Sequence, residues 1–173
     1  STTIDPAMTA VRARSPLALS LGDPAGVGPE LIAEAWAQRR ALDLPVFVVA
    51  GGAHVLQAAA KSRGLDLPIA LIDEPREASA TFANALPVLA AAGDGLFRPG
   101  QPDSEGAALA LHSLEFATAL ARSGAVAGVV TAPVSKAALA QVGFTFPGQT
   151  EFLAHACDVE EQDAVMLLAV PSL

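Results

Sequence analysis

The stretch Val126–Ala154, VAGVVTAPVSKAALAQVGFTFPGQTEFLA, decides the fold that the sequence predicts. It begins with an apolar run rich in valine, which is typical of a strand buried in a parallel sheet. Thr131 to Lys136 follow this strand directly and lead into a helical segment. Ligands of open α/β sheets bind beyond the carboxyl ends of the strands. A hydroxyl and an ammonium at this place are therefore well sited to meet an anion.

Strands and helices alternate in the sequence before this stretch. We expect Ser104 to cap the helix nearest to it and Gly124 to end that helix. The strands are expected at Leu17–Leu21, Pro45–Ala50, Pro68–Ile72 and Leu86–Leu89, and the helices at Glu30–Arg40, His54–Arg63 and Glu105–Ser123. This alternation favours a mainly parallel sheet with crossover helices, which is the α/β fold class.

Two more helices and a strand are expected toward the end of the chain. The helices are Lys136–Val142 and Thr150–Cys157, with Thr150 as the N-cap of the second, and the strand is Ala164–Val170. With 173 residues, the chain is either one domain or a large piece of a two-domain protein. We expect residues 1–15 to form a disordered leader, because they contain no long apolar segment.

The composition narrows the classes of partner. The net charge is −8 and the ten basic residues form no cluster, so we expect neither nucleic acid nor a membrane as a partner. No apolar run approaches the roughly 18 residues of a membrane-spanning helix, and a cytoplasmic location is expected. Cys157 is the only cysteine, which excludes an internal disulfide. Its apolar helical context favours a buried, inert thiol.

Asp23 lies in a glycine-rich loop, GDPAGVGPE (Gly22–Glu30), that follows the first expected strand. The loop does not fit GxGxxG, and it does not fit the Walker pattern because no Gly-Lys-Ser/Thr follows. Asp23 is a candidate to bind a ligand or to act as a base, since it lies at the carboxyl end of a strand. An Asx turn that holds the loop explains this residue equally well.

Lys136, Gln149 and Thr150 are further candidates for binding an anion. A compact ammonium at Lys136 suits a phosphate or a carboxylate. The Gln149 amide and the Thr150 hydroxyl would accompany the free N–H groups at the start of a helix. The alternatives are a solvated lysine and a capped surface helix. His54, His112 and His155 fall on separate expected helices without metal-ligand spacing, so we expect no metal site in this chain.

Three separated motifs allow a comparison with known families: GDPAGVGPE (Gly22–Glu30), VVTAPVSKAAL (Val129–Leu139) and GFTFPGQTEFLA (Gly143–Ala154). In order and spacing they resemble the amino-terminal half of the 4-hydroxythreonine-4-phosphate dehydrogenase family. The resemblance implies a three-layer α/β/α fold like that of isocitrate and isopropylmalate dehydrogenases. It also implies that residues 16–173 are the amino-terminal portion of a two-domain dehydrogenase, with the second domain incomplete or absent.

The resemblance implies a reaction as well. The family oxidises the 3-hydroxyl of 4-phosphooxy-L-threonine with NAD, and the product, 2-amino-3-oxo-4-phosphooxybutanoate, loses carbon dioxide to give 3-amino-2-oxopropyl phosphate for pyridoxal phosphate biosynthesis. A divalent metal (Zn, Mg or Co) held by three histidines polarises that hydroxyl. The family forms homodimers that share metal ligands between subunits. The expected contacts to the small phosphorylated substrate are Asp23, Thr131, Lys136, Gln149 and Thr150.

The chain departs from the family pattern in two respects. Gln149 stands where the family usually has histidine in a Gly-His-Thr-Glu motif, and glutamine carries no charge. The motifs that hold the three metal-binding histidines do not occur, so we expect the metal ligands outside this chain and the chain alone to be inactive. Two alternatives stay open. One is a paralogue that oxidises another phosphorylated hydroxy acid or a cis-dihydrodiol, and the other is a non-catalytic binding module.

Overall fold

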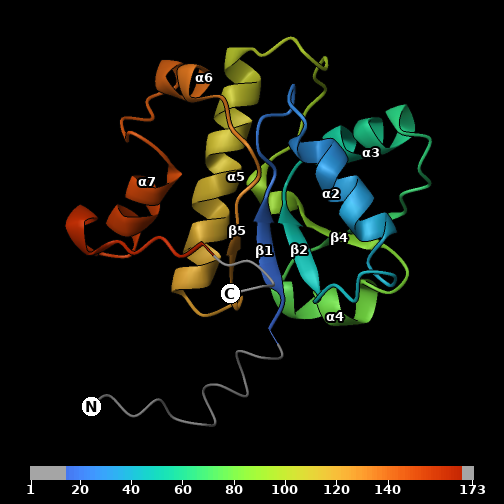
Figure 1. The fold of residues 1–173 in the computed structure, drawn as a ribbon. Coiled ribbons are helices and arrows are strands. Elements are labelled where there is room, and N and C mark those ends of the chain that lie inside the picture. The colour runs from blue at the N-terminus through green and yellow to red at the C-terminus, as the bar shows by residue number, and fades with distance from the viewer. Residues whose placement is uncertain (1–14, 169–173) are drawn as a thin grey trace, which may run out of the picture.

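The computed structural model describes residues 15–168, and they form a central sheet between two layers of helices (Figure 1). The sheet has five strands in the order β3-β4-β2-β1-β5. Each neighbouring pair is parallel. The strands are β1 (Leu17–Ser20), β2 (Phe47–Ala50), β3 (Ile69–Ile72), β4 (Leu86–Leu89) and β5 (Gly128–Val130). The predicted three-layer α/β/α fold with a mainly parallel sheet is confirmed, whereas the expected leader lies almost wholly outside the described residues.

The first four helices connect successive strands, and the last two follow β5. They are α2 (Gly28–Ala37), α3 (Ala53–Ser62), α4 (Ala78–Thr81), α5 (Ser104–Arg122), α6 (Lys136–Gln141) and α7 (Gln149–Ala156). Short 3₁₀ turns, η1 (Pro75–Glu77), η2 (Ala90–Ala92) and η3 (Glu161–Asp163), complete the connections. No helix in the described part of the chain is long and apolar enough to cross a bilayer.

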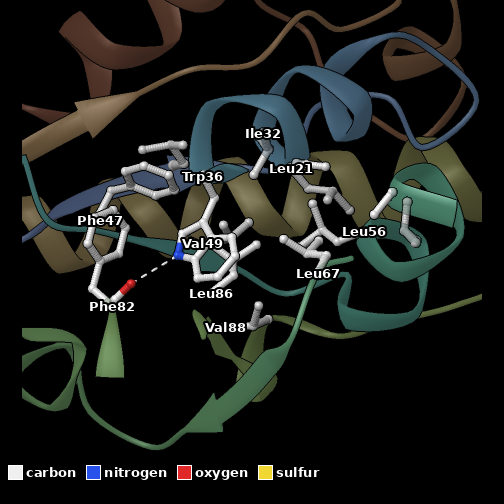
Figure 2. Packing of buried hydrophobic residues seen from close by; sticks show 14 of the residues in the cluster. Leu21, Ile32, Trp36, Phe47, Val49, Leu56, Leu67, Phe82, Leu86 and Val88 are labelled. Atoms are coloured by element: carbon white, nitrogen blue, oxygen red, sulfur yellow. Dashed lines mark hydrogen bonds between the residues drawn. The ribbon is translucent and has the colours of Figure 1, made fainter. Parts of the chain in front are cut away.

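The main core lies between the sheet and the pair α2 and α3 (Figure 2). Alternate strand residues such as Leu19, Val49 and Val88 face this side, because successive side chains of a strand point to opposite faces. Burial of each large side chain contributes about 1.5–3 kcal/mol. The only tryptophan, Trp36, is buried here, and its Nε1 donates a hydrogen bond to the Phe82 carbonyl at 3.1 Å.

The opposite face of the sheet is covered mainly by α5. Residues such as Ala18 and Val48 of the strands pack there against Ala117. The buried positions of α5 recur every three or four residues, which is the period of one helix face. A separate aromatic cluster, made by Phe144, Phe146 and Phe152 with Leu139, fastens α6 and α7 to the outer side of α5.

Arg39 closes the end of α2 against the segment before β4. Its guanidinium lies 3.5 Å from the centre of the Trp36 ring and donates to the carbonyls of Phe82 at 3.1 Å and Ala83 at 2.6 Å. Burial, with a smaller contribution from the charge of Arg40, lowers the pKa of Arg39 from its usual value. An arginine starts so far above neutrality that it stays charged at physiological pH.

Two expected helix caps are wrong by one or two residues. Asp103, rather than Ser104, caps α5 through a 2.7 Å bond from the Gly106 N–H to its Oδ1. At α7 the cap position is Gly148, and Thr150 already lies inside the helix. In both places neighbouring residues are suitable caps by type, so the residue type alone does not decide which one is used.

Two expectations near the end of the chain also fail. The strand expected at Ala164–Val170 is absent over residues 164–168, and its last two residues lie outside the described part. Val165, Met166, Leu167 and Leu168 are instead highly exposed, because no neighbouring strand covers them. Cys157 is exposed rather than buried, since it lies one residue beyond the last turn of α7.

The strand order creates a crevice between β1 and β5. After β1 the chain turns to α2 on one face of the sheet, and after β5 it turns to α6, which packs on the α5 side. Loops that leave neighbouring parallel strands toward opposite faces leave a gap at the carboxyl ends of those strands. The glycine loop and the Thr131–Lys136 turn both lie at this switch point.

Candidate functional site

The glycine loop and the turn after β5 touch each other through their backbones. Gly22 has a φ of +74°, and a Cβ at this position would lie 2.6 Å from the Pro133 carbonyl oxygen. The Asp23 N–H donates to that same oxygen at 2.9 Å. Only glycine supplies both the left-handed backbone and the missing side chain that this approach requires.

Asp23 forms the Asx turn that the sequence left open as one of two interpretations. Its Oδ1 accepts a 2.9 Å hydrogen bond from the Ala25 N–H, and its carbonyl accepts one from the Gly26 N–H at 3.0 Å. The side chain is half-buried. The turn fixes the carboxylate at the carboxyl end of β1, beside the β5 turn.

Two buried serine hydroxyls that sequence reasoning missed support this region. The Ser20 Oγ accepts a bond from the Ala132 N–H at 3.2 Å and so ties the end of β1 to the β5 turn. On α5, the Ser113 Oγ accepts from the Leu21 N–H at 2.8 Å and donates to the Ala50 carbonyl at 2.6 Å. The sequence signal was a polar residue on the apolar stripe of α5, at the position that meets the ends of two strands.

Thr131 borders a small cavity of about 210 Å³ at the switch point. Its other lining residues come from β1, α2 and the end of β5, and they include Ser20, Leu31 and Pro133. The lining is almost wholly apolar apart from the hydroxyls. The cavity has room for a small aliphatic group next to a hydrogen-bonding hydroxyl.

Gln149 joins the start of α7 to this region. Its Nε2 donates a 3.2 Å hydrogen bond to the Ala132 carbonyl, so the helix begins beside the turn that follows β5. Thr150 is the next residue and is exposed. The first N–H groups of α7 have no acceptor within the helix and carry the positive end of its dipole.

Lys136 brings a positive charge to the same helix start. A Cβ at Gly148 would lie 3.6 Å from the Lys136 Nζ and 2.9 Å from the Glu151 Oε2. The glycine therefore leaves room for both side chains beside the first turn of α7. The Glu151 carboxylate lies near the same point, and its negative charge offsets part of the positive charge that Lys136 and the helix N-terminus bring.

The structure thus brings the five predicted residues to one end of the sheet. Thr131, Lys136 and Thr150 make no side-chain hydrogen bond or ion pair with any residue in the range 15–168. Two hydroxyls and an ammonium near a helix start form a donor-rich surface that suits a phosphate or a carboxylate. Asp23 and Gln149 are already engaged with backbone groups.

The histidines lie elsewhere. His54 pairs through its Nδ1 with the Asp94 Oδ2 at 2.7 Å, and both Asp94 oxygens accept from the His54 N–H at 3.1 Å at the start of α3. His155, in the last turn of α7, packs on the Phe146 ring. No three His, Cys, Asp or Glu side chains within residues 15–168 are grouped as metal ligands require.

A larger hollow of about 700 Å³ lies past the end of α7 and contains none of the predicted site residues. Asp158, Glu160 and Glu161 line it, and their charge disfavours an anionic ligand. The switch point is therefore the better candidate site.

The fold is that of a parallel three-layer α/β protein, with a donor-rich candidate site at its switch point. The family model described as pyridoxal phosphate biosynthetic protein PdxA matches residues 43–173. The 4-hydroxythreonine-4-phosphate dehydrogenase of Erythrobacter litoralis is 56% identical over 158 residues, which are 91% of this chain and 47% of the relative. The chain belongs to this family of dehydrogenases.

Solved structures agree with this assignment. The 4-hydroxythreonine-4-phosphate dehydrogenase of Klebsiella pneumoniae has a TM-score of 0.69 at 35% identity, over 82% of this chain and 44% of the other. A terephthalate 1,2-cis-dihydrodiol dehydrogenase of Burkholderia xenovorans has a TM-score of 0.65 at 28% identity, over 86% and 42% of the two chains. The chain spans about half the length of the curated relatives that it matches.

Proposed function

We propose that this chain supplies the phosphate-binding part of the substrate pocket of an NAD-dependent dehydrogenase in pyridoxal phosphate biosynthesis. The proposed substrate is 4-phosphooxy-L-threonine, whose 3-hydroxyl is oxidised. The observation that carries the proposal is the convergence of the glycine loop, the β5 turn and the start of α7 at one end of the sheet. The supporting relatives bear the name of this enzyme.

Each predicted residue has a proposed part in binding. Lys136 neutralises the phosphate, and Thr150 with the first N–H groups of α7 donates hydrogen bonds to it. Thr131 holds the aliphatic part of the substrate at the small cavity, and Gln149 and Asp23 orient the polar groups. Contacts that bind the substrate and the transition state equally well lower the KM. The chemical step needs other groups, which act on the reacting carbon.

The metal of the proposed reaction does not fit the residues described here, since they include no group of ligands for it. A divalent metal would supply Lewis-acid polarisation of the hydroxyl. We propose that its ligands, and the homodimer that shares them, belong to the remainder of the full-length enzyme. A cytoplasmic location is proposed with this assignment.

A second candidate is a paralogue that oxidises a cis-dihydrodiol or another phosphorylated hydroxy acid. It is favoured by the likeness to the dihydrodiol dehydrogenase and by the neutral Gln149. The substitution Gln149→His in a full-length protein would separate the two candidates. The paralogue would be supported by a large rise in activity on 4-phosphooxythreonine together with a loss of activity on the substrate that the unsubstituted protein oxidises.

The proposal that this chain binds substrate but lacks the metal ligands has a direct test. The purified 173-residue chain is mixed with NAD, 4-phosphooxy-L-threonine and Zn²⁺ or Mg²⁺, and NADH formation is followed by absorbance. We expect no turnover, because the chain lacks a grouped set of metal ligands in its described part. Sustained NADH formation that depends on both substrate and metal would contradict the proposal.

A further inference from the structure

Residues 93–103, which join η2 to α5, pass over the glycine loop, and we call this segment the strap (Figure 1). The Gly100 N–H donates a hydrogen bond to the Ala25 carbonyl of the glycine loop at 2.8 Å. Phe97 and Pro99 line, together with residues of that loop, a gap of only about 30 Å³. The strap and the glycine loop therefore pack closely against each other.

The strap is anchored at both ends. At its start, the Asp94 carboxylate accepts from the His54 N–H at 3.1 Å and pairs with the His54 Nδ1 at 2.7 Å, at the beginning of α3. At its end, Asp103 caps α5 by accepting from the Gly106 N–H at 2.7 Å. Because both anchors are starts of packed helices, a movement of the strap is confined to residues 95–102.

The middle of the strap is attached by few contacts. Leu96 is 83% exposed, and Pro99 and Gly100 are exposed as well. Phe97 is half-buried and packs against the main core, where a Cβ at Gly106 would lie 3.3 Å from its ring. Segments with few buried apolar contacts open at a lower free energy than the whole molecule unfolds. The middle of the strap therefore lifts more easily than the sheet unfolds.

Ala25 couples the strap to the Asp23 carboxylate. Its N–H donates to the Asp23 Oδ1 at 2.9 Å, and its carbonyl accepts from the Gly100 N–H at 2.8 Å. The residue thus has the carboxylate on one side and the strap on the other. When the strap lifts, the Ala25 carbonyl loses its partner, and the turn that fixes the carboxylate is free to change.

We propose that the strap sets the geometry of the Asp23 turn, with Phe97 as the positioning residue that keeps the strap closed. The strap opens and closes without unfolding of the sheet, and the Asp23 carboxylate is fixed at the end of β1 only in the closed form. This conformational device goes beyond the proposed function, and it does not depend on which substrate binds.

Native-state hydrogen exchange of the unsubstituted chain tests whether the strap and the turn open together. The Ala25, Gly26 and Gly100 amides donate hydrogen bonds within the turn and between the turn and the strap. We expect these amides to share one free energy of opening, which is lower than that of the Val49 amide in the central strand β2. A free energy for Gly100 that differs from that of the other two would overturn the inference.

Variants of Phe97 test its positioning role. Phe97→Ala should speed exchange of the Ala25 and Gly100 amides at least about tenfold, because the ring loses its burial. Phe97→Leu keeps an apolar side chain and should restore most of the protection, and Leu96→Ala is the exposed control that should change nothing. An Ala25 amide that exchanges in Phe97→Ala as in the unsubstituted chain would overturn the inference.

The side-chain carboxyl carbon of Asp23 gives a spectroscopic readout that a purely structural role of Phe97 would not move. Its nuclear magnetic resonance signal should shift in Phe97→Ala, whereas the carboxyl signal of Asp94, in the anchored start of the strap, should stay in place. An unchanged Asp23 signal in a Phe97→Ala protein whose Gly100 amide exchanges faster would overturn the coupling between the strap and the turn.

Gly100 offers a variant that leaves the core intact. Gly100 and Gly64 have φ values of +74° and +69°, and nothing lies within 4 Å of a Cβ at either position. Alanine therefore strains the two backbones to a similar degree. Gly100→Ala should speed exchange of the Ala25 amide about fivefold, and Gly64→Ala should leave it unchanged. Equal Ala25 exchange in the two variants would overturn the inference.

Discussion

At the scale of single residues, the Ser113 hydroxyl holds the ends of two strands at the candidate site. It is fully buried and bridges the Leu21 N–H and the Ala50 carbonyl. Buried backbone groups that lose a partner bear the full cost of their desolvation. This one hydroxyl therefore supports both the sheet and the entry to the glycine loop.

The substitution Ser113→Ala is expected to lower the free energy of unfolding by about 2 kcal/mol or more, because a buried donor and a buried acceptor both lose their partner. Urea titration followed by Trp36 fluorescence measures the change. Ser123→Ala at the end of α5 removes an exposed hydroxyl bond and serves as the control, with an expected change below about 0.5 kcal/mol. Equal effects of the two substitutions would contradict the role of Ser113.

At the scale of elements, the conformation of the glycine loop requires its backbone to lie against the turn that follows β5. Gly22 and Gly124 both have left-handed backbones, with φ values of +74° and +77°. They differ in their surroundings, because a Cβ at Gly22 would overlap the Pro133 carbonyl and nothing lies within 4 Å of one at Gly124. The pair thus separates backbone strain from steric overlap.

The substitution Gly124→Ala should destabilise the protein by about 1 kcal/mol, the cost of a left-handed backbone in a residue with a Cβ. Gly22→Ala should cost roughly 2 kcal/mol more, since the loop and the turn must also move apart. Chemical denaturation of both variants measures the difference. A Gly22→Ala variant as stable as Gly124→Ala would show that the approach of the two segments has no energetic weight.

The packing of α6 and α7 predicts a local unit of stability. Phe152 packs with Phe144 and Phe146 in a cluster apart from the two clusters that flank the sheet. We expect Phe152→Ala to speed hydrogen exchange in α7 roughly a hundredfold, the factor for about 3 kcal/mol. The urea transition seen by Trp36 should move little, whereas Leu56→Ala in the main core should shift it strongly. If Phe152→Ala shifted the urea transition seen by Trp36 as strongly as it changed hydrogen exchange in α7, then α6 and α7 would not be a separate unit of stability.

The sequence predicted the strands and the glycine loop well, because runs such as Phe47–Ala50 and the spacing of Gly22 and Gly28 are local signals. It failed where distant segments decide the outcome. The apolar residues from Ala164 onward predict a strand by their type, but a strand forms only beside a neighbouring strand of a sheet. The hydrogen bond between Ser20 and Ala132 joins residues far apart in the chain, and no local sequence pattern predicts such a contact.

At the scale of the whole molecule, the strand order places the candidate site. With β5 on one side of β1 and β2 on the other, the loops after β1 and β5 diverge and leave a gap at the carboxyl ends of these two strands. The net charge of −8 repels an anion at long range, so the site must attract it locally. Lys136 supplies that local charge in our account.

The most direct test of the central claim uses the two lysines of the chain, Lys61 and Lys136. Isothermal titration calorimetry with 4-phosphooxy-L-threonine is carried out on the unsubstituted chain, on Lys136→Met and on Lys61→Met, whose side chain lies on the solvent-facing side of α3. We predict saturable binding that weakens at least about tenfold in Lys136→Met, because a charged hydrogen bond is lost, and that is unchanged in Lys61→Met. Equal affinity of all three proteins, or the absence of saturable binding to the unsubstituted chain, would contradict a phosphate site at the switch point.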